Sequence, residues 1–153
     1  MKILKIRALK YALIMSGVTG FCLFMMQLTG QNDSFDSKSP FQFLFMFIAP
    51  PIVWYFGIRD KKKANKGKLH FKQGVMEGAK ISLAYGLISP FVFLLYYGIN
   101  PTILEYVKQS YNMSSSPTAV VIAIDMTAQF IGSIIFGTFY GAIISLILRS
   151  KKK

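Results

Sequence analysis

The sequence has little of what most catalytic sites need. It contains one cysteine, Cys22, and one histidine, His70. A single cysteine excludes an internal disulfide, and a single histidine excludes any site that needs two imidazoles. No phosphate-binding loop, nucleophile elbow or pair of metal ligands is present. We therefore expect no metal, no cofactor and no enzymatic activity.

Acidic residues are also scarce, and charge as a whole is low. The 153 residues include 6 acidic and 18 basic ones, and 16% are charged, whereas about a quarter is usual in soluble domains. The basic residues stand in three blocks: Lys2, Lys5, Arg7 and Lys10; Arg59, Lys61, Lys62, Lys63, Lys66, Lys68 and Lys72; Arg149, Lys151, Lys152 and Lys153. A soluble nucleic-acid binder would interleave its basic residues with core positions. The blocks instead indicate a membrane protein, with no nucleic acid as partner.

Four long apolar runs lie between or beside these blocks. They cover residues 11–30, 41–58, 75–98 and 122–148, and the last run begins as early as Thr118. Twenty helical residues extend about 30 Å, which is enough to cross the hydrocarbon core of a bilayer. The pattern predicts a single domain, residues 1–153, that is all-α: an integral membrane bundle of four transmembrane helices. A cleaved signal peptide is the alternative for the first run, but no small-residue cleavage site follows it.

Prolines within the runs predict distorted helices. Pro50 and Pro51 lie inside the second run and Pro90 inside the third. An interior proline removes a backbone donor and kinks the helix. Tyr85 and Tyr140 are expected to donate hydrogen bonds to backbone carbonyls that these prolines free.

The distribution of Lys and Arg predicts the orientation. With four spans, both termini and the loop 59–74 share one side, which holds 15 basic residues, whereas the opposite loops, 31–40 and 99–117, hold only Lys38 and Lys108. Lys and Arg are retained in the cytoplasm, so both termini should be cytoplasmic. Apolar residues at helical spacing predict a short amphipathic surface helix over Leu104–Tyr111, before the last span.

The basic loop is expected to contact anionic phospholipids. Near an acidic leaflet each basic residue contributes about 1 kcal/mol of binding. The residues assigned to this contact are Arg59, Lys61, Lys62, Lys63, Lys66 and Lys68.

Small residues recur every four positions in the third and fourth runs. They are Gly74, Gly78, Ser82 and Gly86 in the third, and Ser133, Gly137, Gly141 and Ser145 in the fourth. Residues four apart share a helix face, and small residues allow the close approach that drives helix packing in lipid. We expect the two helices to pack within the monomer. Homodimerisation through Gly137 and Gly141 is the alternative.

Two polar pairs lie within or beside the apolar runs. Glu77 and Lys80 are three residues apart and can form an ion pair, either as an interfacial pair or as part of a proton or ion relay. Asp125 and Gln129 are one helical turn apart and form a second polar patch, either at the outer membrane interface or as a functional site within the membrane. Both pairs are candidate intramembrane polar sites.

Three stretches are similar to a known group of proteins. They are "YFGIRDKKK" (Tyr55–Lys63), "KGKLHFKQGVMEG" (Lys66–Gly78) and the tail "ISLILRSKKK" (Ile144–Lys153). Together with the order of the spans, they resemble small four-span bacterial membrane proteins of the domain of unknown function 4199 family. The resemblance implies a bacterial cytoplasmic (inner) membrane protein of this fold, and it implies no catalytic activity.

The resulting hypothesis is a small inner-membrane protein that is a non-enzymatic accessory or structural component. Its partners would be the lipid bilayer, anionic phospholipid and either a second copy or another membrane protein. The alternative is a small transporter or channel, with a pathway between the proline-kinked second and third spans and with Glu77 and Lys80 at its inner mouth.

Overall fold

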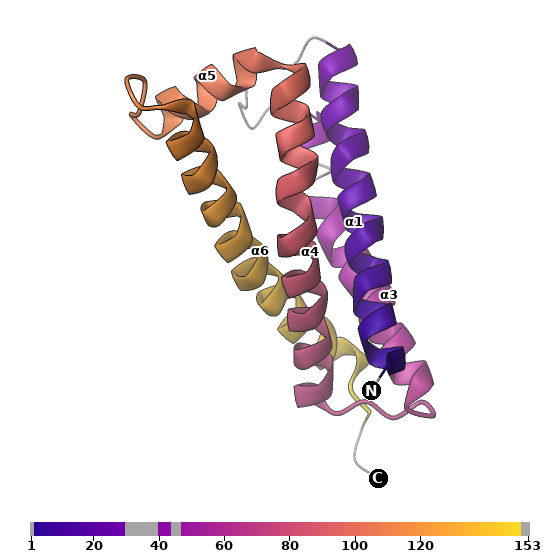
Figure 1. Ribbon diagram of the computed structural model, residues 1–153. Helices are drawn as coiled ribbons and strands as arrows, with labels where there is room; N and C mark the ends of the chain where they lie inside the picture. The colour runs from indigo at the N-terminus through magenta and orange to yellow at the C-terminus, as the bar shows by residue number, and fades with distance from the viewer. Residues whose placement is uncertain (1, 30–39, 44–46, 151–153) are drawn as a thin grey trace.

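A computed structural model describes residues 2–29, 40–43 and 47–150 and shows an architecture built from helices (Figure 1). The helices are α1 (Lys2–Leu28), α2 (Pro40–Phe43), α3 (Ala49–Ala64), α4 (Phe71–Ile99), α5 (Pro101–Ser110) and α6 (Thr118–Leu148). Within these ranges there is no strand. The predicted all-α class is therefore confirmed.

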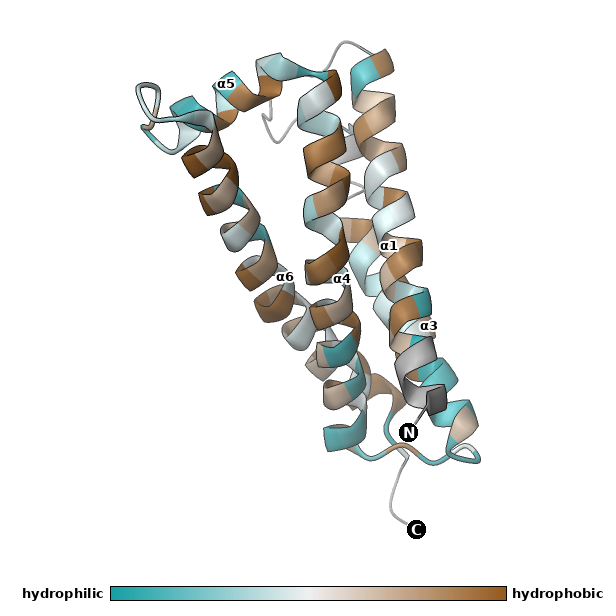
Figure 2. Cartoon of the chain, in the orientation of Figure 1, coloured by the Kyte–Doolittle hydropathy of each residue, from teal (hydrophilic) through white to brown (hydrophobic). Residues whose placement is uncertain are grey.

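Three of the helices are long and apolar enough to cross a membrane. These segments are Arg7–Leu28 in α1, Phe71–Ile99 in α4 and Thr118–Leu148 in α6. These helices consist largely of apolar residues (Figure 2), and many large apolar side chains on them are exposed; Leu95 and Phe136, for example, are 71% and 64% exposed. A face of this kind is stable against lipid rather than water. The structure thus supports a membrane protein.

The second predicted span, 41–58, is described only in part. Its described residues are the single turn α2, the π-helical Phe47 and Ile48, and the start of α3, which extends from Ala49 to Ala64. Only ten residues of α3, Ala49 to Ile58, precede Arg59, which is about 15 Å of helix. For this reason α3 is not among the three helices that could cross a membrane by length and composition.

Pro50 and Pro51, which are expected to kink the second span, lie where π-helical residues meet α3. Both prolines lie in the first turn of α3, which Ile48 precedes as N-cap. Phe47 and Ile48 are π-helical, and π-helical turns are among the usual sites of helix bending. The kink at these prolines therefore stays a prediction. Pro90, in contrast, lies inside α4 as predicted.

The basic region is more helical than predicted. Instead of a loop over 59–74, α3 continues through Lys61, Lys62 and Lys63, and α4 begins at Phe71. Basic residues in a last helical turn interact favourably with the helix dipole, which stabilises this extension. The remaining turn uses positive φ angles at Lys66 and Gly67, of 54° and 79°.

The predicted surface helix before the last span is confirmed as α5. It begins three residues earlier than expected, because Pro101 occupies its first turn, where proline is favoured. Ile103 and Val107, one turn apart, are buried against α4 and α6. Helix α5 therefore closes the end of the molecule opposite the basic turn (Figure 1).

The stripes of small residues on α4 and α6 face each other. A Cβ added at Gly78 would lie 2.7 Å from the Cα of Gly141, and each further glycine of the stripes meets a small residue in the same way. The opposing positions are Gly74 with Ser145, Gly78 with Gly141, Ser82 with Gly137, and Gly86 with Ser133. Each step moves four residues down one helix and four up the other, so the helices pack antiparallel within the monomer. Beyond Gly86 and Ser133 they diverge toward α5 (Figure 1).

Candidate functional site

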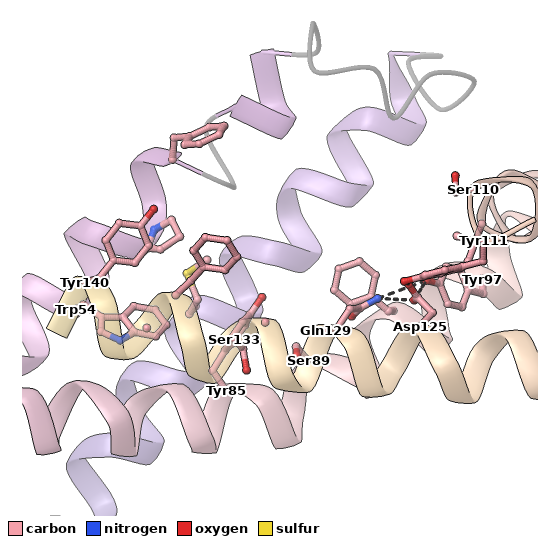
Figure 3. Close-up of a pocket in the computed structure, with 18 of the residues that line it drawn as sticks. Trp54, Tyr85, Ser89, Tyr97, Ser110, Tyr111, Asp125, Gln129, Ser133 and Tyr140 are labelled. Atoms are coloured by element: carbon pink, nitrogen blue, oxygen red, sulfur yellow. Dashed lines mark hydrogen bonds between the residues drawn. The ribbon is translucent and has the colours of Figure 1, made fainter. Parts of the chain in front are cut away.

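A cavity of about 450 Å³ lies where α4 and α6 diverge (Figure 3). Residues of α1, α3, α4, α5 and α6 line it, and many of them are aromatic: Phe47, Trp54, Tyr85, Phe93, Tyr97, Tyr106, Tyr111, Phe136 and Tyr140. The cavity results from the packing of α4 on α6. The stripes of small residues bring the two helices together near the basic turn, and large aromatic residues separate them toward α5. Its size is within the usual range for small-molecule sites.

Hydrogen bonds position the wall of the cavity that lies nearest the stripe. Trp54 Nε1 of α3 donates to Ser82 Oγ at 3.1 Å, and Ser82 Oγ donates to the carbonyl of Gly78 at 2.8 Å. The rings of Trp54 and Tyr85 meet edge to face, 6.2 Å between centroids. These contacts attach the start of α3 to the stripe of α4.

The predicted backbone partner of Tyr85 is wrong. Its hydroxyl lies 3.0 Å from Thr19 Oγ1 of α1, and Thr19 Oγ1 itself donates to the carbonyl of Met15 at 2.9 Å. Since the single hydroxyl hydrogen of Thr19 is used on Met15, Tyr85 is the donor to Thr19. Tyr140 lines the cavity and is half-buried.

A polar cluster forms the other end of the cavity, beside α5. Asp125 of α6 is 8% exposed. It accepts hydrogen bonds from the Tyr97 hydroxyl of α4, from Gln129 Nε2 at 2.5 Å, and from the Tyr111 hydroxyl at 3.2 Å. The structure thus brings the predicted pair, Asp125 and Gln129, together with two tyrosines from other segments. Figure 3 shows the four side chains converging at one end of the cavity.

The donors that the structure describes at Asp125 are all neutral. Two are phenols and one is an amide, so none of them cancels the charge of the carboxylate. Burial, followed by the charge and the hydrogen bond of Asp125, raises the pKa of the Tyr111 phenol. The cluster is therefore a site of negative potential at the end of an aromatic cavity.

Two hydrogen-bond acceptors of the cluster have no donor in the described structure. A carboxylate has about four lone-pair positions, and three of those on Asp125 are used, two at Oδ2 and one at Oδ1. Gln129 directs its Nε2 at the carboxylate, and its Oε1 is buried without a hydrogen-bond partner. A buried acceptor without a partner is unfavourable unless something donates to it. The Asp125 carboxylate can thus accept a further hydrogen bond from a bound molecule.

The predicted pair of Glu77 and Lys80 is replaced by a pair with α1. Glu77 is 1% exposed, and its Oε1 lies 3.7 Å from Nη1 of Arg7, whereas Lys80 is exposed. Glu77 thus lies on the face of α4 that is buried against α1, whereas Lys80 lies at the exposed edge of that face. Neither residue lines the cavity that the structure describes.

The predicted lipid-contact residues lie in the last part of α3 and in the turn before α4, at the end of the molecule opposite α5 (Figure 1). Arg59, Lys63, Lys66 and Lys68 are exposed, and Lys61 and Lys62 are half-buried. The surrounding backbone is held firmly: Tyr11 of α1 donates to Asp60 at 2.5 Å, and Ser150 and Leu69 form a backbone hydrogen bond of 3.0 Å. These side chains therefore project from a structured platform, which we call the basic end.

Sequence reasoning missed Arg7, Tyr97, Tyr111 and Trp54 as site residues. The sequence groups Arg7 with the other basic residues near the N-terminus. It lies only four residues before the first uncharged run, however, and on the same predicted side of the membrane as Glu77. Tyr97 and Tyr111 are separated from Asp125 by 28 and 14 residues. Helical periodicity relates only residues within one helix, so no spacing rule connects them.

Comparison with known proteins places the chain in a family. The family described as "Protein of unknown function (DUF4199)" matches residues 10–150, which is nearly the whole chain. No curated protein and no solved structure matches it. The match covers α3, α4, α5 and α6 completely, together with most of α1. The chain therefore belongs to the DUF4199 family, as its basic turn and lysine tail had indicated.

Proposed function

We propose that this protein is a multi-pass component of the bacterial cytoplasmic membrane with a non-enzymatic, accessory or structural role. In this proposal the basic end lies in the cytoplasm and contacts anionic phospholipid. The observation that supports it is the clustering of exposed basic side chains at one structured end of the molecule, opposite the end that α5 closes (Figure 1). Such a surface attracts acidic headgroups, at about 1 kcal/mol per basic residue.

The direction of the helices supports four membrane crossings. Helices α1 and α4 both begin at the basic end and run away from it (Figure 1). If both cross the membrane in the same direction, the segment between them, residues 29–70, must cross back. Helix α3 contributes the part of this return that is nearest the basic end. With α6 as the last crossing, both termini would be cytoplasmic, in agreement with the charge rule.

The transporter alternative has weaker support. Its pathway was expected between the second and third spans, with Glu77 and Lys80 at the mouth. Glu77 is instead buried against Arg7, and neither Glu77 nor Lys80 lines the cavity. We therefore place the accessory role first.

Lipid retention tests the proposed contact. The variant replaces Arg59, Lys61, Lys62, Lys63, Lys66 and Lys68 by Gln, and the matched control is Lys108→Gln at the other end. Both are extracted from membranes containing equal amounts of phosphatidylglycerol and phosphatidylcholine, and bound lipid is identified by native mass spectrometry. We expect the wild type and the control to retain phosphatidylglycerol preferentially and the variant to lose this preference. Equal retention of the two lipids by the wild type would refute the contact.

A further inference from the structure

We propose that the aromatic cavity binds a cationic amphiphile, an organic ammonium ion on an apolar body. The first ground is the free lone-pair position on Asp125, a residue that lines the cavity. A carboxylate accepts strongly from a charged donor, and an ammonium group carries several N–H donors. An ammonium group in the cavity can therefore donate to Asp125.

The second ground is charge complementarity. Asp125 is buried, and its described donors, Tyr97, Tyr111 and Gln129, are neutral. A buried charge without a counterion is costly, so binding a cation stabilises the site. The rings that flank the carboxylate add to this effect, because aromatic faces attract ammonium ions. Neither argument favours an anionic or a neutral ligand.

The third ground is the shape and polarity of the rest of the cavity. Away from Asp125 its walls are mainly apolar and aromatic, and they include Trp54, Phe93 and Phe136. Phe47 and Phe136 are largely exposed, so the cavity reaches the outer surface between α3 and α6. On a helix in a bilayer, that surface faces acyl chains. The apolar body of the ligand can thus lie along the cavity and extend toward the lipid.

The site does not suit a phospholipid. Phosphatidylethanolamine also carries an ammonium group, but its phosphate would have to lie near Asp125. The lining residues that the structure describes include no Lys, Arg or His to neutralise that phosphate. We therefore commit to an amphiphilic amine without a phosphate.

Trp54 provides a direct reporter of binding. It is the only tryptophan in the chain, and it lies at the end of the cavity opposite Asp125 (Figure 3). Bromine quenches tryptophan fluorescence on contact. The probe is an alkylamine with bromine on its terminal carbon, added to the full-length protein in phosphatidylcholine vesicles. The matched neutral probe is the brominated alcohol of the same chain length. We expect saturable quenching by the amine at a concentration at least ~10-fold lower than by the alcohol.

Two variants test the site from its two ends. Asp125→Asn removes the charge and should weaken binding of the amine ~10-fold or more while leaving the alcohol unchanged. Gly132→Leu fills the cavity from α6, where an added Cβ meets nothing within 4 Å, and should abolish saturable quenching by the amine. This variant keeps the proposal testable if Asp125→Asn does not fold. The matched control is Gly17→Leu on α1, which also has open space and does not line the cavity, and it should bind like the wild type.

Three results would overturn the proposal. The first is equal quenching by amine and alcohol, which would mean simple partitioning into an apolar space. The second is unchanged amine binding in Gly132→Leu. The third is saturable quenching by phosphatidylethanolamine with a brominated chain at the same concentration as the amine, which would make the occupant a lipid. A clear preference for the amine that is lost in both site variants supports it.

Discussion

At the scale of single residues, the two buried carboxylates of the described structure differ in how they are stabilised. Asp125 has three neutral hydrogen-bond donors. Glu77 has a cation, Arg7, at 3.7 Å, and neither Glu77 Oε1 nor Arg7 Nη1 has a hydrogen-bond partner. An ion pair that is buried without hydrogen bonds contributes little net stability, but removing one partner leaves an uncompensated charge. Glu77 therefore depends on Arg7 as a counterion.

The dependence of Glu77 on Arg7 predicts unequal effects of mutation. Arg7→Met leaves a carboxylate that is 1% exposed and should cost about 3–5 kcal/mol of unfolding free energy. Glu77→Gln should cost less, because a long arginine near the end of a helix can reach water. The double variant Arg7→Met/Glu77→Met should recover most of the loss. Denaturant unfolding in detergent measures all three, and a double variant as unstable as Arg7→Met would contradict the pairing.

The raised pKa of the Tyr111 phenol predicts that the protein loses stability at alkaline pH. Burial, and then Asp125, raises the pKa of its phenol in the folded protein, so the unfolded chain loses the proton first, near its ordinary value of about 10. The contribution of Tyr111 is fully present below that pH and is lost as pH rises through the folded pKa. The free energy of unfolding, measured as a function of pH, should fall more steeply above pH ~10 in the wild type than in Tyr111→Phe. Identical slopes would contradict the shift.

At the scale of helices, the stripes of small residues determine the packing of α4 on α6. Close approach through Gly78 and Gly141 supplies van der Waals contact, which is the main attraction available to helices in lipid. The alternative role of Gly137 and Gly141, a homodimer interface, would need this face to be free. In the structure α4 covers it.

Alanine substitutions test this contact with a matched pair of glycines on α4. A Cβ at Gly78 would lie 2.7 Å from the backbone of Gly141, which cannot move aside without separating the helices. Gly78→Ala should therefore destabilise the protein by about 1–3 kcal/mol. Gly98→Ala, where an added Cβ meets nothing within 4 Å, should be neutral or stabilising by up to about 1 kcal/mol. Thermal unfolding in detergent compares the two, and equal losses would contradict the account.

The helices and their packing could be predicted from the sequence only in part. The spacing of Gly74, Gly78, Ser82 and Gly86 identified a packing face, because a helix presents every fourth residue on one side. Together with the matching stripe of Gly137 and Gly141 it also predicted the partner helix, which the structure confirms, but not the register. The change from π-helical Phe47 and Ile48 to α3 at Ala49 could not be predicted, because an apolar run containing prolines does not show what kind of helix precedes them. The cavity could not be predicted, because it depends on where α4 and α6 diverge.

At the scale of the whole molecule, charge and hydropathy divide the protein along its length. Exposed Lys and Arg gather at the end where α1 and α4 begin and α6 finishes, and apolar faces cover the helices beyond it (Figure 2). The sequence predicted this division, because charge blocks and apolar runs are local features. The polar cluster of Asp125, Tyr97 and Tyr111 lies toward the other end. It could not be predicted from the sequence, because only the fold brings these residues together.

Accessibility of single cysteines tests the membrane crossing most directly. In a Cys22→Ala background, which has no other cysteine, Lys66→Cys and Ser150→Cys mark the basic end, and Asn112→Cys marks the end beside α5. An impermeant maleimide is applied to intact spheroplasts and to inverted vesicles. We expect Asn112→Cys to react only in spheroplasts and the other two only in inverted vesicles. Labelling of Asn112→Cys and Lys66→Cys from the same side would contradict the crossing of α4 and with it the membrane orientation proposed for this protein.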